Sequence, residues 1–435
     1  MIFSLDVRRA RKGDCLLVHY GTKAKPRLML IDGGPGDVYK PQLRPRLLQL
    51  RKQRHLDDAD PLTVDLMMVS HVDDDHIRGL IDLTREEIEK SDAHQPVMLN
   101  VLDFWHNSFD AIIGHTPKEL TAAITQQFGA AAAGGAGLDD VALQAVEEES
   151  DEEADVLRSG LQVLASIEQG FRLRQNADRL GYPRNAEFGG DLVMAAKTAP
   201  PIDLDGSLTL TVVGPMKPEL KKLQEKHQKW LKEMKAKGTP VSAALAAYVD
   251  PSVPNLSSIV VVAEVSGKRM LLTGDARGDK ILEGLELVGL VKKGGTLEVD
   301  LLKVPHHGSS NNLDADFFER IVARHYVFSG NGEHGNPERE SLEMLFDARG
   351  KKPFTVHLTY PIVEIDVERK KDWEKERAKE QAKKKKKPAT KVRPMWSPAK
   401  HGLKSFVDDL QLAQGQKIVI VDATQPHVID LLDAF

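Results

Sequence analysis

Short apolar runs that end abruptly in polar residues recur along the chain. The run from Val64 to Val69 leads into residues 70–79, which contain two histidines and three aspartates. Four other runs have the same form: residues 28–31 before Asp32-Gly-Gly, 97–105 before His106-Asn107, 269–273 before Gly-Asp275-Ala, and 301–305 before His306-His307-Gly-Ser-Ser. A short continuous apolar run bounded by turn signals is typical of a buried strand. The pattern therefore predicts a series of strands that each end in a residue type able to bind metals.

Helical spacing of apolar residues appears between these runs. Residues 42–55, 77–90 and 217–237 carry apolar side chains three and four positions apart, with charged residues between them. Strands that alternate with helices predict an α/β fold. We expect residues 1–106 and 207–365 to form the two halves of one domain. Residues 399–435 would complete it with a strand and a helical turn at 427–432.

Two segments depart from this alternation. Residues 107–206 are rich in Ala, Gln and Leu, with helical periods and few strand signals. We expect a helical insertion there, which would cover the site as a lid or present a surface to a protein partner. Residues 366–398 are rich in Lys and Glu. Such a segment is typical of a solvated helix or linker, and it also fits an arm that contacts phosphates.

Composition narrows the class of protein. The chain has 435 residues and a formal net charge of −5, so no global basic field would recruit nucleic acid. A single cysteine, Cys15, excludes a disulfide framework within the chain and fits a reducing compartment. No run approaches the roughly 20 apolar residues that span a bilayer. We therefore expect a cytoplasmic protein without a membrane segment or signal peptide.

Residues 70–79 carry the densest cluster of candidate chemistry. Like-charged carboxylates repel one another, and a divalent cation is the usual reason for gathering them beside imidazoles. The alternative is a polar turn or a helix N-cap, because Asp caps helices well. The four other strand ends favour the cation, since they supply further ligand types. Histidine and carboxylate ligands suit Zn²⁺, and more oxygen ligands also admit Mn²⁺.

The order of these motifs resembles the metallo-β-lactamase superfamily. The segments in question are Asp32-Gly-Gly, His71-x-Asp73-x-Asp75-His76, Gly-Asp275-Ala and His307-Gly-Ser. Asp73 stands where most metal-binding members carry a histidine. This variant is similar to the soluble hydrolase domain of ComEC-type DNA-uptake proteins and their stand-alone relatives. Residues 13–18, 255–260 and 331–337 also resemble that branch, although Asn336 replaces a histidine. The likeness covers about residues 1–105 and 207–345.

The resemblance implies an αββα sandwich with two mixed sheets packed face to face. It also implies a site for two divalent ions, which would be Zn²⁺ or Mn²⁺, with Mg²⁺ as a further option. The implied ligands are His71, Asp73 and His106 for one ion, Asp75, His76 and either His306 or His307 for the other, and Asp275 between the two. Asn107 is the alternative to His106, and His307 fits the family motif better than His306. Asp32 would orient a ligand from outside the set.

Two further roles concern the substrate. A hydroxide between the ions would attack phosphorus, with Asp75 beside it as a catalytic residue. Ser309 and Ser310 would donate to a substrate phosphate. His334 is the candidate proton donor to the leaving oxygen, and a turn histidine without chemistry is the alternative.

Three functions fit these features. The first is a phosphodiesterase, in particular a nuclease that acts on DNA. The second is a hydrolase of a small molecule, such as a cyclic nucleotide, a phosphoester or an acyl compound. The third is an effector subunit that a protein partner controls through residues 107–206. The transfer from fold to substrate is analogy, because one fold hosts many reactions.

Overall fold

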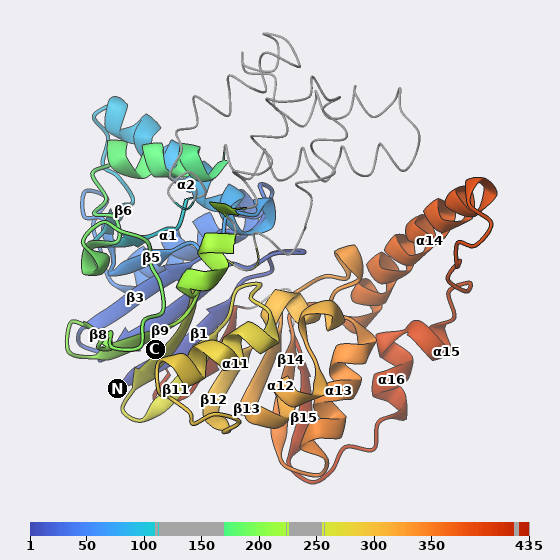
Figure 1. Ribbon diagram of the computed structural model, residues 1–435. Coiled ribbons are helices and arrows are strands. Elements are labelled where there is room, and N and C mark those ends of the chain that lie inside the picture. Colours follow the sequence, from blue (N-terminus) through green and yellow to red (C-terminus); the bar gives the residue numbers. More distant parts are fainter. Residues whose placement is uncertain are drawn as a thin grey trace.

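The computed structural model describes residues 1–108, 112, 169–222, 224–225, 255, 257–421 and 426–434. The chain forms a mixed α/β fold with two large sheets (Figure 1). The predicted α/β class is therefore confirmed. Most of the insertion expected at 107–206, and most of the helix expected at 217–237, lies outside the described residues.

The first sheet comes mainly from the N-terminal half of the chain. Its strand order is β16 (His427–Asp430), β1 (Ile2–Val7), β2 (Leu16–Gly21), β3 (Pro26–Ile31), β5 (Leu66–Met68) and β7 (Phe104–Trp105). The pairs from β16 to β3 are antiparallel, and β3, β5 and β7 are parallel to one another. A parallel pair of short strands, β4 (Leu62–Val64) and β6 (Leu99–Val101), lies apart from this sheet.

The second sheet has eight strands. Their order is β15 (Gln416–Ile420), β14 (Phe354–Leu358), β13 (Ile321–Phe328), β12 (Leu297–Lys303), β11 (Lys268–Leu272), β10 (Val260–Val265), β9 (Leu208–Gly214) and β8 (Ile202–Leu204). The strands from β8 to β11 pair antiparallel, and those from β11 to β15 pair parallel.

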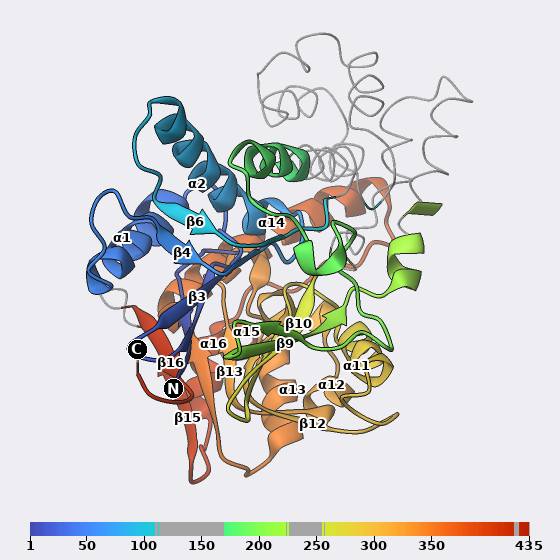
Figure 2. The ribbon, with the colours of Figure 1, turned by 90° about the vertical axis from the view of Figure 1, so that its left-hand side faces the viewer.

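Strands β1, β2 and β5 are buried on both faces, which explains the continuous apolar runs in the sequence. In β3, Leu28 and Leu30 join a core shared with helices, whereas Met29 and Ile31 face the second sheet. Side chains of successive residues point to opposite faces of a strand. The core between the sheets contains residues of both, so the two sheets pack against each other (Figure 2).

Helices cover the outer face of each sheet. The first sheet carries α1 (Arg44–Gln53) and α2 (Asp74–Asp92). The second carries α11 (Gly278–Leu287), α12 (Ala315–Arg320), α13 (Arg339–Arg349) and α16 (Leu403–Asp409). The long helix α14 (Ile362–Lys386) projects away from the sheets and is followed by the short α15 (Pro398–His401) (Figure 1). Among the described residues, no helix has the length and apolar character needed to cross a membrane.

Some predicted elements differ from the structure. The apolar run 97–105, predicted as one strand, forms β6 and β7, which belong to different sheets. Residues 427–430 form a strand, β16, rather than a helical turn. Pairing with β1 decides this, because its residues occupy register positions opposite Ser4 to Val7. Helix α2 begins at Asp74 instead of residue 77, so Asp75 and His76 lie in its first turn.

Candidate metal centre

The segment from His71 to His76 follows β5 and enters helix α2. Asp73 occupies the N-cap position of α2, but its side chain makes no capping hydrogen bond. Its Oδ2 instead lies 3.5 Å from Nε2 of His71. His71 and His76 are buried, with relative exposures of 2% and 0%. The alternative of a simple capping turn therefore does not account for these side chains.

Glycines allow the Asp32 loop to reach the start of α2. A Cβ on Gly33 would lie 2.4 Å from the amide nitrogen of Leu80, and one on Gly79 would lie 1.9 Å from the carbonyl oxygen of Gly33. No larger residue fits this approach of two backbones. The amide of Gly33 donates to the carbonyl of His76 over 2.7 Å. The contact places Asp32 directly beside the buried histidine.

Asp32 fixes the orientation of His76. Its Oδ1 accepts from the amide of Ser70 over 2.7 Å, and its Oδ2 accepts from the Ser70 hydroxyl over 2.6 Å. Oδ2 also lies 2.9 Å from Nδ1 of His76. A carboxylate on one ring nitrogen sets the tautomer and leaves the other nitrogen available as a ligand. The Nε2 of His76 is therefore directed at the centre of the site.

Asp275 lies in the middle of the histidines. Its Oδ1 is 3.3 Å from Nε2 of His76 and 3.4 Å from Nε2 of His307. Its Oδ2 is 3.8 Å from Nε2 of His71 and 3.6 Å from Nε2 of His306. Each carboxylate oxygen therefore faces its own pair of imidazole nitrogens. Asp275 follows β11, and the two adjacent histidines follow β12, which is parallel to β11.

The backbone of the histidine pair is strained. His306 and His307 have φ angles of 48° and 55°. Non-glycine residues adopt this left-handed region at a cost, and such residues concentrate at functional sites. The amide of His306 donates to the carbonyl of Gly274 over 3.1 Å, which ties the pair to the turn before Asp275. The strained turn sends the two rings to different oxygens of the same carboxylate.

Asp14 is a member of the cluster that the sequence reasoning missed. Its Oδ1 lies 3.6 Å from Nδ1 of His307, and its Oδ2 lies 2.7 Å from Nζ of Lys303. Asp14, His76, Asp275 and His307 each offer a ligand atom, and these atoms lie within 4.8 Å of one another. The four buried side chains could hold a metal ion. The signal for Asp14 in the sequence is its place in residues 13–18, just before β2, which were noted only for their resemblance to the ComEC-type branch.

The donor set fits a cation. The Nε2 atoms of His71, His76 and His307 and the Oδ1 of Asp275 are buried without a hydrogen-bond partner among the described residues. Buried polar atoms are almost always hydrogen-bonded, and each exception needs an explanation. Imidazole nitrogen and carboxylate oxygen are the ligand types of Zn²⁺, and they also suit Mn²⁺. Divalent cations bound in this cluster would give these buried atoms the partners they lack.

The electrostatics of the site show the same complementarity. Burial lowers the pKa of His76, but the charges of Asp275 and Asp32 outweigh it and raise that pKa well above its ordinary value. Burial raises the pKa of Asp275, but His307, His76 and His306 hold it well below its ordinary value. The pKa of Asp75 is lowered, because His76 and His307 outweigh its burial. A metal ion would take the place of the protons on the histidines.

His106 and Asn107 have other contacts in this structure. Nε2 of His106 lies 3.0 Å from the carbonyl oxygen of Gly170, and its ring packs 5.5 Å from that of Phe104. The side chain of Asn107 donates to the carbonyl of Val193 over 2.8 Å and accepts from its amide over 2.9 Å. These two hydrogen bonds connect Asn107, which follows β7, to Val193. Metal ligation by either residue stays a prediction.

The predicted substrate residues lie around the cluster. Ser310 donates to Glu338 through its amide over 2.9 Å and also through its hydroxyl. Ser309 is buried, and its amide donates to the carbonyl of His306 over 2.9 Å. His334 lies at the rim, where its Nε2 is 3.4 Å from Nζ of Lys12. Only His334 of these three therefore sits beside an exposed cation.

Comparison with known proteins gives partial likenesses. No family model matches the chain. ComE operon protein 3 of Bacillus subtilis (strain 168) is 29% identical over 98 residues, which are 22% of this chain and 12% of that protein. The microtubule-associated protein futsch of Drosophila melanogaster is 43% identical over 58 residues, or 13% of this chain and 1% of that protein. Microtubule-associated protein 1A of Rattus norvegicus is 35% identical over 88 residues, or 19% and 3%. The chain thus spans about an eighth or less of these relatives.

Proposed function

We propose that this chain is a metal-dependent phosphodiesterase of the metallo-β-lactamase type, and that it cleaves a nucleic-acid strand. The single observation that carries the proposal is the position of Asp275 between two pairs of imidazoles, one pair on each carboxylate oxygen. A shared carboxylate with a separate ligand set on each side suits two ions. The two facing sheets with outer helices and the short match to ComE operon protein 3 add support.

The distances support a proposal for two ligand sets. His71, Asp73 and His306 would hold one ion on the Oδ2 side of Asp275, and His76, His307 and Asp14 would hold the other on the Oδ1 side. Asp75 would stay beside the second set as a catalytic carboxylate. This assignment uses both histidines of the pair and leaves His106 outside. Ions bound there would supply Lewis acidity and a nucleophile near neutral pH.

The rim of the cluster would handle the substrate. The ammonium of Lys12 can pair with a phosphate oxygen, and His334 beside it can give a proton to the leaving oxygen. Gly13 follows Lys12 and approaches α2 so closely that a Cβ would lie 1.7 Å from the carbonyl oxygen of Asp75. The loop that carries Lys12 is thereby held against the catalytic carboxylate.

A small phosphoester is the second candidate substrate, and residues 169–179 favour it. These residues are helical, and Nε2 of Gln169 donates to Asp74 over 3.0 Å. Part of the predicted insertion therefore lies against the first turn of α2. A site covered from that side would admit a small molecule more easily than a duplex.

Metal analysis and a hydrolysis assay with matched histidine variants test the proposal. His307→Asn removes a ligand, and His94→Asn makes the same change at an exposed residue with the same φ of 55°. We expect the wild type and His94→Asn to retain Mn²⁺ or Zn²⁺ and to cleave bis(p-nitrophenyl) phosphate. We expect His307→Asn to lose both properties.

The substrate panel then separates the two candidates. Single-stranded DNA, plasmid DNA, RNA and cyclic dinucleotides would be incubated with the metal-loaded protein. Cleavage of polymers supports the nuclease, and cleavage confined to cyclic dinucleotides supports the small-molecule enzyme. Wild-type protein that binds neither metal, or His307→Asn protein that cleaves at the wild-type rate, would contradict the whole assignment.

A further inference from the structure

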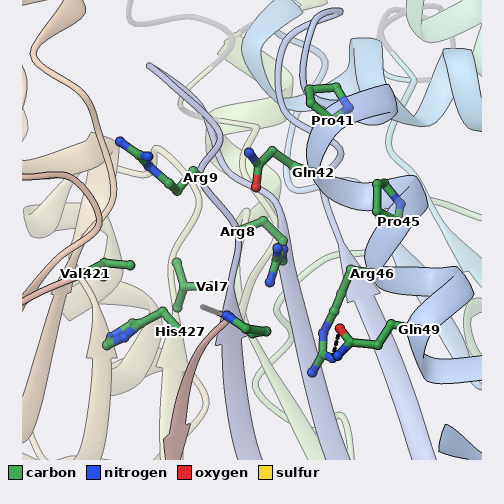
Figure 3. A pocket seen from close by; sticks show the side chains of 11 residues that line it. Val7, Arg8, Arg9, Pro41, Gln42, Pro45, Arg46, Gln49, Val421 and His427 are labelled. Atoms are coloured by element: carbon green, nitrogen blue, oxygen red, sulfur yellow. Dashed lines mark hydrogen bonds between the residues drawn. The ribbon is translucent and has the colours of Figure 1, made fainter. Parts of the chain in front are cut away.

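A polar cavity outside the candidate metal centre lies between β1, α1 and the start of β16. Its volume is about 330 Å³, and Figure 3 shows Arg9 and His427 on one side and Arg46 and Gln49 on the other. Its polar lining consists of Arg8, Arg9, Arg46, Gln42, Gln49 and His427. None of these residues belongs to the candidate metal centre. The cavity is therefore a separate feature of the fold.

Positive charge exceeds negative charge around this cavity. Asp6 pairs with Nε of Arg46 over 2.5 Å and with Nη1 of Arg8 over 3.1 Å. Burial raises the pKa of Asp6, but a hydrogen bond from His19 and the charges of Arg46 and Arg8 outweigh it and lower that pKa to about 2. The single ionised carboxylate of Asp6 is therefore the ion-pair partner of two guanidinium groups, those of Arg8 and Arg46.

The third guanidinium, that of Arg9, lies over the ring of Tyr360, 4.2 Å from its centroid, and its carboxylate partner is at the surface. Nη2 of Arg9 lies 2.7 Å from Glu364, whose side chain is 56% exposed. Exposed ion pairs of this kind contribute little. The Nε atoms of Arg8 and Arg9 are buried and make no hydrogen bond within the described part of the chain. Both guanidinium groups therefore keep a donor that the described residues leave unsatisfied, which is costly in a buried setting.

We propose that this cavity binds a small phosphate-bearing ligand of mononucleotide size. The planar guanidinium group matches phosphate oxygens in a bidentate manner, and the glutamine amides add neutral donors. Pro41 and Pro45 supply an apolar wall for the rest of the ligand. A volume of about 330 Å³ stands at the lower end of small-molecule pockets. The site does not depend on the function of the metal centre.

Calorimetric titration of the full chain with adenosine 5′-monophosphate tests this site. The protein is first treated with a chelator, so that phosphate cannot bind through metal ions. The informative variant is Gln49→Glu. Oε1 of Gln49 accepts from Nη1 of Arg46 over 2.7 Å, and a glutamate keeps this bond while adding a negative charge. Gln53→Glu is the control, because Gln53 is exposed on the same helix and does not line the cavity.

We expect saturable binding to the wild type and to Gln53→Glu, and binding weaker by about tenfold or more for Gln49→Glu. Arg8→Gln, which leaves Arg46 on Asp6, should weaken binding in the same way. Adenosine without phosphate should bind more weakly than the monophosphate. The site is wrong if the wild type shows no saturable binding in the millimolar range. Equal affinity of Gln49→Glu and wild type, or of adenosine and its monophosphate, would also overturn it.

Discussion

The buried ion pair between Lys303 and Asp14 gives the most direct test of the structure. Both side chains are buried, with relative exposures of 0% and 1%, and their charged atoms lie 2.7 Å apart. Lys303 ends a central strand of the second sheet, and Asp14 precedes a strand of the first. The pair therefore joins the two sheets beside the candidate metal centre. We predict that Lys303→Met and Asp14→Asn each strongly destabilise the protein.

The magnitude follows from the distance and the burial. At an effective dielectric constant of about 20, charges 2.7 Å apart attract each other by about 6 kcal/mol. Desolvation offsets much of that attraction, but removing one partner leaves the other charge buried without its nearest opposite charge. Such a change costs about 3–5 kcal/mol. The double variant removes both charges of the pair, so it should lose less free energy of unfolding than either single variant.

Urea unfolding of chelator-treated protein, followed by tryptophan fluorescence, measures these changes. Lys268→Met is the control, because Lys268 pairs with Asp300 over 3.0 Å but its side chain is 30% exposed. That change should cost no more than about 1 kcal/mol. If the decreases in unfolding free energy of Lys303→Met and Asp14→Asn are simply additive in the double variant, the two residues are not coupled and the prediction is wrong. It also fails if Lys303→Met costs no more than the control.

Three further predictions concern the site and the core. Asp32→Asn should weaken metal affinity about 10- to 100-fold in a metal titration, because the charged group that orients His76 is lost; unchanged affinity would contradict this role. Gly13→Ala should reduce metal content and thermal stability, because its Cβ would lie 1.7 Å from a carbonyl oxygen of α2, whereas Gly36→Ala has ordinary contacts and should not. Burial and two neighbouring histidines lower the pKa of His357 from 6.5 to about 3. Below pH 6.5 the unfolded chain therefore protonates His357 before the folded protein does, and the free energy of unfolding falls as the pH drops from 6.5 towards 3. His357→Gln should remove up to about 5 kcal/mol of this acid-induced loss in urea titrations at several pH values; an equally steep loss in the variant would refute it.

The sequence predicted those residues of the candidate site that directly follow buried strands. Apolar runs mark strands locally, and the structure brings together the side chains that follow them at 32, 71, 76, 275, 306 and 307. The grouping was predicted from the resemblance of the motif order to a known superfamily. The sequence could not decide between His306 and His307 as the ligand. Two left-handed backbone conformations place one ring beside each oxygen of Asp275, and the sequence pattern does not reveal them.

Other parts of the site depend on contacts between distant segments. Asp14 is buried because Lys303 neutralises it, and neither residue signals the other in the sequence. His106 turns its Nε2 to the carbonyl of Gly170, which belongs to a segment without a recognisable motif. Strand β16 lacks a long apolar run, so only its pairing with β1 identifies it as a strand. Local patterns predict elements, whereas these features need the tertiary arrangement.

The place of β16 also has a consequence for synthesis on the ribosome. This strand covers the outer edge of β1, and Ser4 lies opposite Asp430 in the register. The first sheet therefore keeps an open edge while more than four hundred residues are translated. Open strand edges pair readily with other chains and promote aggregation. A nascent or prematurely terminated chain that ends before residue 427 would expose this edge and would be a natural client for a chaperone.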